Sequence, residues 1–248
     1  MAESTLSRIR GQRIEKLERL RALGIEPYPS RANRSHGCGD IEDAFETLEG
    51  ERVAICGRVM FLRRQGALTF SQIQDESGRV QAALGRDTIP EQSSDGALGY
   101  TDLKLLDIGD YVQIEGPVAK TKRGEVSVFG DTIRLLAKGI RPLPEKHKGL
   151  ADREAILRRR YLHVTTQPEI KDHFGRVACI SRSARDFLWA RGFIEFATPV
   201  IQTQYGGGTA NPFRTHVDAL GIDAYLSISH ELYLKRLIAA GYEKVFTI

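Results

Sequence analysis

The sequence predicts an α+β protein in which an N-terminal helix and a five-stranded barrel precede a second domain of mixed helix and strand. The hydrophobic period changes twice: it is near 3.6 residues over 5–23, two from about residue 51, and helical again beyond 150. A length of 248 residues allows one large or two ordinary domains. We place the helix and lead-in at 1–30, the barrel at 31–145, and the connection and second domain at 146–248.

The composition is that of a globular protein with a sizeable core. Hydrophobic residues make up 41% and charged residues 27%, and the net charge of +4 is too small to indicate a nucleic-acid module by itself. No apolar run reaches the roughly 18 residues of a membrane span, and the N-terminus has no signal-peptide pattern. Cys38, Cys56 and Cys179 are far apart, which predicts free thiols in a reducing cytoplasm and no zinc site.

The first helix should bury a leucine-rich stripe and end at Gly24, since Pro27 follows. Its other face carries six cations: Arg8, Arg10, Arg13, Lys16, Arg19 and Arg21. Clustered cations attract phosphates, so this face predicts either an RNA-backbone contact or an ordinary solvated surface.

Short strands follow, with one partly helical connection after the third. We expect a five-stranded barrel from the stretches 51–62, 68–74, 79–84, 111–119, 125–129 and 132–137. This order and these lengths favour an OB-fold, a small barrel that commonly binds single-stranded nucleic acid. A barrel or sandwich without that function is the alternative.

The second half begins with a Pro- and Gly-rich connection at 138–150. We expect a short helix capped by Asp152, and then a long helix from Pro168 to Gly192. The long helix should bury its apolar positions, which are Ile170, Phe174, Val177, Ala184 and Leu188. Strands at 193–202 and 223–228, a helix at 230–240 ended by Gly241, and a strand-like end at 244–248 complete the prediction. An end of strand composition led us to expect a truncated chain.

Four segments in the second half of the chain resemble those of a known family. RGFIEFATP (191–199) resembles motif 1 of class II aminoacyl-tRNA synthetases, in which a long helix and a strand ending in proline build the dimer interface. GGGTANPFRTH (206–216) and SHELYLKRL (229–237) are similar to segments of bacterial-type lysyl-tRNA synthetases, as is the stretch from RPLP (141–144) to RYL (160–162). Together they resemble that family in the correct order along the chain.

The resemblance implies a lysine–tRNA ligase, which uses ATP and Mg²⁺ to activate lysine and transfers it to tRNA(Lys) for translation. It implies that Glu231 receives the α-amino group of lysine and that the backbone of Gly207 approaches it. It further implies a homodimer whose motif 1 includes Gly192, Phe193 and Pro199.

The resemblance also implies an anticodon-binding surface on the barrel. Four residues match anticodon-reading positions: Arg63, Phe70, Gln81 and Glu125. Phe70 would stack on a base, Gln81 and Glu125 would contact base edges, and Arg63 would hold a phosphate or a base.

The sequence departs from the family pattern at Asn211, His230 and Thr247, where Arg, Pro and Glu are usual. Motifs 2 and 3 are absent, and with them the ATP-binding arginines and the acidic metal ligands, so we expect no metal ligands here and no lysyl-adenylate formation by this chain alone. The alternatives are a non-catalytic RNA-binding protein derived from a synthetase, an aspartyl- or asparaginyl-type ligase, and an unrelated OB-fold protein.

Overall fold

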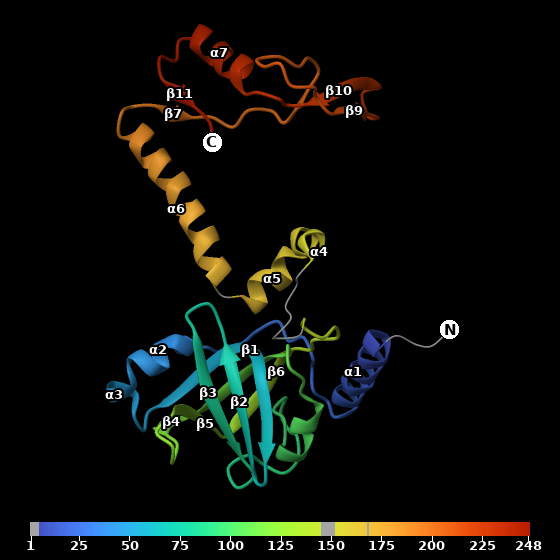
Figure 1. Ribbon diagram of the computed structural model, residues 1–248, viewed down its shortest axis with the longest axis vertical. Helices are drawn as coiled ribbons and strands as arrows, with labels where there is room; N and C mark the ends of the chain where they lie inside the picture. The colour runs from blue at the N-terminus through green and yellow to red at the C-terminus, as the bar shows by residue number, and fades with distance from the viewer. Residues whose placement is uncertain (1–4, 145–151, 168) are drawn as a thin grey trace. The chain divides into compact units, whose positions relative to one another are not determined.

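The computed structural model in Figure 1 describes residues 5–144, 152–167 and 169–248. The chain divides into two compact units, Met1–Gly149 and Leu150–Ile248, and each is described by itself. Within the described residues, no helix has both the length and the apolar character needed to cross a bilayer.

Unit 1 is built on a six-stranded sheet of order β1-β2-β3-β5-β4-β6, in which β1 also pairs with β4. Its strands are β1 (Arg52–Gln65), β2 (Leu68–Gln74), β3 (Arg79–Gly85), β4 (Tyr111–Lys120), β5 (Val126–Gly130) and β6 (Thr132–Ala137). Because β4 returns to β1, the pairings of five strands close a ring. All pairs are antiparallel except β3–β5. This is the predicted OB-type arrangement.

The last two predicted stretches are observed as β5 and β6. β5 pairs with β4 at 118–120 and β6 pairs with β4 at 111–115, so both follow the same edge of β4. At the end of β5 the chain passes close to β3 and β4. A Cβ added at Gly130 would lie 2.7 Å from side-chain atoms of Leu84 in β3 and of Ile114 in β4. A glycine permits this close approach and interrupts the strand.

The core of unit 1 lies inside the ring of strands. Alternate residues of the strands point inward, and Ile55, Ile73, Leu84, Ile114 and Ile133 are at most 1% exposed. The 3₁₀ helix η1 (Tyr100–Leu105) and the helix α2 (Cys38–Asp43) add buried side chains to the same cluster. A short helix α3 (Phe45–Leu48) precedes β1.

Helix α1 (Thr5–Ala22) ends as predicted at Gly24, whose φ is +73°. The Ile25 N–H donates to Leu20 O and the Gly24 N–H donates to Arg21 O, each at 3.0 Å, and both Leu20 and Ile25 are buried. This is a Schellman motif with its hydrophobic contact.

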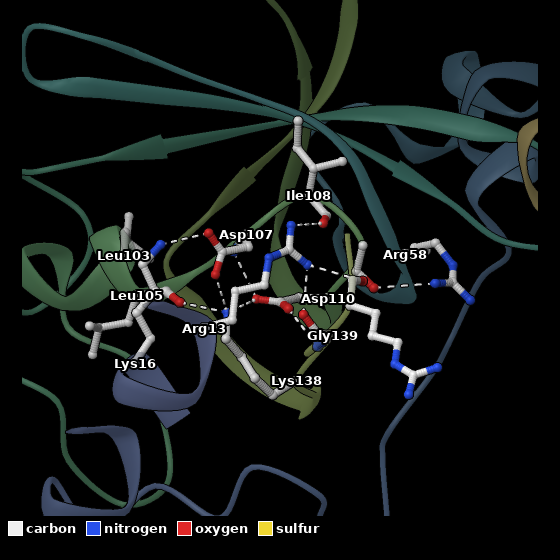
Figure 2. A network of polar contacts seen from close by, with 12 residues as sticks. Arg13, Lys16, Arg58, Leu103, Leu105, Asp107, Ile108, Asp110, Lys138 and Gly139 are labelled. Carbon is white, nitrogen blue, oxygen red and sulfur yellow. Dashed lines mark hydrogen bonds and ion pairs between the residues drawn. The ribbon is translucent and has the colours of Figure 1, made fainter. Parts of the chain in front are cut away.

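A network of buried and partly buried charges links α1 to the segments that precede β4 and follow β6 (Figure 2). The ammonium group of Lys138 has no solvent exposure and donates to Asp110 at 2.8 Å, to Asp107 at 2.6 Å and to Leu105 O at 2.8 Å. Lys16 of α1 reaches Asp107 at 2.6 Å, and Arg13 of α1 donates to Gly139 O at 2.6 Å. Lys138 therefore belongs to unit 1, although we expected it in the interdomain connection; residues 145–150 of that connection lie outside the described residues.

Unit 2 contains four helices and five short strands among its described residues (Figure 1). These are α4 (Arg153–Arg158), α5 (Arg160–Thr166), α6 (Glu169–Trp189), β7 (Ile194–Glu195), β8 (Ile201–Gln202), β9 (Arg214–Val217), β10 (Ile222–Leu226), α7 (Glu231–Ala239) and β11 (Val245–Phe246). Strands β8, β10 and β9 form one antiparallel sheet in that order, and β7 pairs with β11 in parallel. The carboxylate of Asp152 caps α4 by accepting from the Ala155 N–H at 2.7 Å, as predicted.

The apolar face of α6 is not buried, so the expectation of a buried stripe was wrong. Phe174 and Val177 are 45% and 48% exposed, Ala184 is exposed, and Ile170 and Leu188 are half-buried. The physical reason is that no described element packs over this face of the helix. Pro168, where we expected the helix to begin, lies outside the described residues.

Candidate functional site

A β-bulge in β1 decides which side chains lie on the outer face of the sheet of unit 1. Val59 pairs with the buried Ile73, but the next paired residue is Phe61, opposite Gln72, so that Met60 is the extra residue. Without the bulge, alternation would turn Phe61 and Arg63 toward the core. With it, Arg63 pairs with Phe70 on the outer face.

Three of the four predicted anticodon residues share this face. Arg63 is exposed, and Phe70 is half-buried between the buried Thr69 and Ser71, which point inward. Gln81 of β3 pairs with Gln72 of β2, two residues along from Phe70. Since directly paired residues point to the same side, the three side chains lie on one continuous surface.

Glu125 lies at the edge of this surface. It is exposed and directly precedes β5, whose Ser127 pairs with Gln81. The Ser127 hydroxyl shares its one proton between Gln81 Oε1, at 3.0 Å, and Glu125 O, at 3.2 Å. Ser127 is fully buried, so it holds Gln81 and the backbone of Glu125 at fixed positions.

The three strands β1, β2 and β3 hold five arginines and no acidic residue. Arg52 forms ion pairs with Asp131 and Glu115, and Cζ of Arg58 lies 4.4 Å from the ring centroid of Tyr111. Arg64 pairs with the inward-pointing Thr69 and donates to Leu103 O. The outer face of these strands therefore combines aromatic rings and amides with the exposed guanidinium of Arg63, which is the composition of a surface for single-stranded nucleic acid.

The cationic face of α1 is only partly available to a ligand. Arg13 and Lys16 point into unit 1, where they bind backbone carbonyls and Asp107. Burial by itself would raise the pKa of the Asp107 carboxyl. Hydrogen bonds from Lys138 and Lys16 outweigh this effect, so the pKa is lowered. Two of the six cations that predicted an RNA contact thus have a structural role.

A second candidate site lies in unit 2, where Gly207 packs against the start of α7. Gly207 has a φ of +81°, and a Cβ there would lie 2.9 Å from Ser229 Oγ and 3.1 Å from Glu231 Cβ. The Glu231 N–H donates to Ser229 Oγ at 3.2 Å. The carboxylate of Glu231 is half-exposed and forms an ion pair with Lys235 one turn further along α7. A backbone turn and a carboxylate are thus adjacent, as a site for an ammonium group requires.

Of the three residues that depart from the family pattern, His230 lies beside this site, directly before α7. The hydroxyl of Thr198 is hydrogen-bonded to Nδ1 of His230, the residue that precedes α7. Asn211 is exposed and Thr247 is half-buried.

The segment 191–199, which resembles motif 1, follows α6 and includes β7. Gly192 has a φ of +78°, and Phe193 N–H donates to Leu188 O at 3.1 Å, so the helix ends in the same Schellman motif as α1. Phe193 is half-buried, with the ammonium of Lys244 5.9 Å from its ring centroid. Pro199 is exposed, and its carbonyl accepts from Gln202 Nε2 at 3.1 Å.

The described residues contain no cluster of metal-ligating side chains. No group of three or more His, Cys, Asp or Glu side chains among them could hold a metal ion. All three cysteines are free, and burial raises the pKa of the Cys38 and Cys56 thiols, which keeps them neutral.

Comparison with known proteins decides the family. Residues 152–248 match the family model described as tRNA synthetases class II (D, K and N), and residues 53–136 match the OB-fold nucleic acid binding domain. The lysine–tRNA ligase of Roseiflexus castenholzii is 46% identical over 98% of this chain, and that of Pelotomaculum thermopropionicum is 42% identical over 99%. The chain belongs to the lysine–tRNA ligase family. It spans about half the length of these relatives, 49% and 47% respectively.

Membership of the lysine–tRNA ligase family argues against an aspartyl- or asparaginyl-type ligase and against an unrelated OB-fold protein. The class II model covers three amino-acid types, but the ligase of Gloeobacter violaceus, 40% identical over 100% of the chain, is again lysine-specific by name. An OB-fold protein unrelated to synthetases is excluded.

What sequence reasoning missed at the candidate interface is Phe61, because Val59, Met60, Phe61 and Leu62 are all apolar and hide the bulge.

Proposed function

We propose that this chain functions in lysine–tRNA ligation, and that the outer face of β1, β2 and β3 reads the anticodon of tRNA(Lys). The observation that carries the proposal is the pairing of Arg63 with Phe70 on that face, with Gln81 on the adjacent strand. The reaction is the ATP-dependent activation of lysine and its transfer to tRNA(Lys) for translation.

Each residue of the face has a distinct role in the proposal. Phe70 stacks on an unstacked anticodon base, which contributes roughly 1–3 kcal/mol and depends little on base identity. The amide of Gln81 both donates and accepts, and the carboxylate of Glu125 accepts, so these two residues discriminate base edges. Arg63 neutralises a phosphate or stacks on a base beside Phe70.

Glu231 and Gly207 supply the lysine contacts in this proposal. The carboxylate of Glu231 exchanges its ion pair with Lys235 for the α-amino group of lysine, and its place in the first turn of α7 stabilises the negative charge. The turn at Gly207 leaves room because it has no side chain to contact Ser229. ATP is the second substrate, and Mg²⁺ is the metal that the family resemblance implies.

We further propose that the protein acts in the cytoplasm as a homodimer through the segment that contains Gly192, Phe193 and Pro199. The exposed apolar side chains of α6, which leads into this segment, support a partner there. Domain bounds of 1–30, 31–145 and 146–248 remain our proposal for the functional parts.

A non-catalytic tRNA-binding protein derived from a synthetase is the second candidate. It is supported by the face of β1–β3, which is assembled within unit 1 alone. ATP–pyrophosphate exchange by the purified chain tests this second candidate. We expect no exchange above background from this chain alone, and robust lysine-dependent exchange would exclude the non-catalytic candidate.

The proposal is tested by the affinity of the full chain for tRNA(Lys), compared with tRNA(Lys) whose anticodon bases are replaced. We expect weaker binding of the altered tRNA, and a similar loss with Phe70→Ala. Phe213→Ala removes an aromatic ring that is 78% exposed in unit 2 and is the matched control. Equal affinity for both tRNAs would refute anticodon reading by this chain.

A further inference from the structure

Phe61 is an exposed aromatic side chain on the face proposed to bind RNA. Its side chain is 45% exposed, although phenylalanine in a strand usually points into the core. The bulge at Met60 places it there, since Phe61 pairs with the half-buried Gln72 on the outer face. Bulges that redirect a side chain are common beside functional sites.

The register places Phe61 beside Phe70. Phe70 is two residues from Gln72 along β2, so it is the diagonal neighbour of Phe61 across the β1–β2 pair. Diagonal neighbours on one face lie roughly 7–8 Å apart. Two separate rings on one face can therefore each accept a base from successive nucleotides of an extended strand.

The charge of the surroundings indicates a single-stranded nucleic acid as the occupant. Arg63 is two residues from Phe61 on the same face, and the three strands that build the face contain no carboxylate. Alternating aromatic and cationic side chains suit bases and phosphates in turn. The carbonyl of Phe61 accepts from the Ser71 hydroxyl at 3.1 Å, which fixes the backbone below the ring.

We propose that Phe61 is a second base-stacking position, which binds the nucleotide next to the one stacked on Phe70. Gln72, directly opposite, contacts the edge of that base through its side-chain amide. The inference rests on the proposed function, because it extends the same RNA surface by one nucleotide. It assigns to Phe61 and Gln72 a contribution to affinity and to the choice of the flanking base.

The experiment measures binding of anticodon stem-loops of tRNA(Lys) to the full chain, with the fluorescent base 2-aminopurine at single loop positions. Phe61→Ala should weaken binding about tenfold and should remove the quenching of 2-aminopurine at one loop position. Phe70→Ala should remove quenching at the adjacent position instead. Phe61→Trp should restore both affinity and quenching, whereas Phe61→Leu, which keeps apolar area without a ring, should not.

The outcomes distinguish failure of this inference from failure of the proposed function. If Phe61→Ala binds and quenches as the unchanged chain does while Phe70→Ala does not, the Phe61 position is refuted and the proposed function stands. If the unchanged chain does not bind the stem-loop, the Phe61 position and the proposed function are both refuted. Because the Phe61 side chain is exposed, the thermal unfolding midpoint of Phe61→Ala should match that of the unchanged chain, which excludes a folding defect.

Discussion

Arg63 of β1 and Phe70 of β2 lie directly opposite each other, and both side chains point away from the core. This arrangement sets a fixed cation beside an aromatic ring on a strand pair that carries no acidic residue. In the proposed function, a base on the ring and its phosphate near the guanidinium form one unit of RNA recognition.

Arg63→Gln should weaken binding of the tRNA(Lys) anticodon stem-loop and reduce its salt dependence. Loss of one phosphate contact to a single strand lowers the slope of log affinity against log salt by about 0.7. The measurement is a salt titration of affinity. Arg182→Gln, which removes an exposed cation from α6, should leave the slope unchanged; an unchanged slope in Arg63→Gln would show that Arg63 holds no phosphate.

Lys138→Met should destabilise unit 1 by about 3–5 kcal/mol, because it leaves the fully buried carboxylate of Asp110 without its cation. Urea unfolding followed by circular dichroism measures this loss. Adding Asp110→Asn to Lys138→Met should recover part of it, since the unpaired charge is then gone. A loss below about 1 kcal/mol in Lys138→Met would mean that the network contributes little.

Asp131 should make the stability of unit 1 sensitive to acid. The hydrogen bond from Arg52 holds the pKa of this carboxyl below its usual range. Its contribution is therefore present above the unfolded value near 3.9 and is lost as pH falls through the lower folded value. Unfolding free energies between about pH 5 and pH 2 should fall less steeply in Asp131→Asn than in the unchanged chain. Parallel curves would contradict the linkage.

Gly207→Ala should disturb the start of α7 more than Gly221→Ala does. Both glycines have positive φ, at +81° and +63°, so both variants carry backbone strain. Only at Gly207 does the new Cβ meet Ser229 and Glu231, whereas nothing lies within 4 Å at Gly221. Amide hydrogen exchange should accelerate at Glu231 in Gly207→Ala alone. Equal acceleration in both variants would show that the contact is unimportant.

Local patterns predicted the helix ends of this protein well. Gly24, Gly192 and Gly241 end α1, α6 and α7 with positive φ, as their positions after apolar periodic segments indicated. Such motifs depend on a few adjacent residues, so the sequence contains the whole signal.

Features that depend on distant residues were not predicted. Lys138 lies in a Pro- and Gly-rich stretch typical of a linker, and its partners Asp107 and Asp110 are 31 and 28 residues away. The bulge at Met60 is hidden in a run of apolar residues, so the outward position of Phe61 could not be read from alternation. The exposure of α6 depends on what packs over the helix, which the helix's own pattern does not contain.

Photo-crosslinking tests the anticodon-binding face most directly. A tRNA(Lys) carrying one photoreactive pyrimidine in the anticodon is irradiated with the full chain, and the attached peptide is identified by mass spectrometry. We predict attachment to β1 and β2, within residues 58–74, and its loss when excess unmodified tRNA(Lys) competes. Attachment confined to α1 or to unit 2 would contradict the assignment of this face to the anticodon.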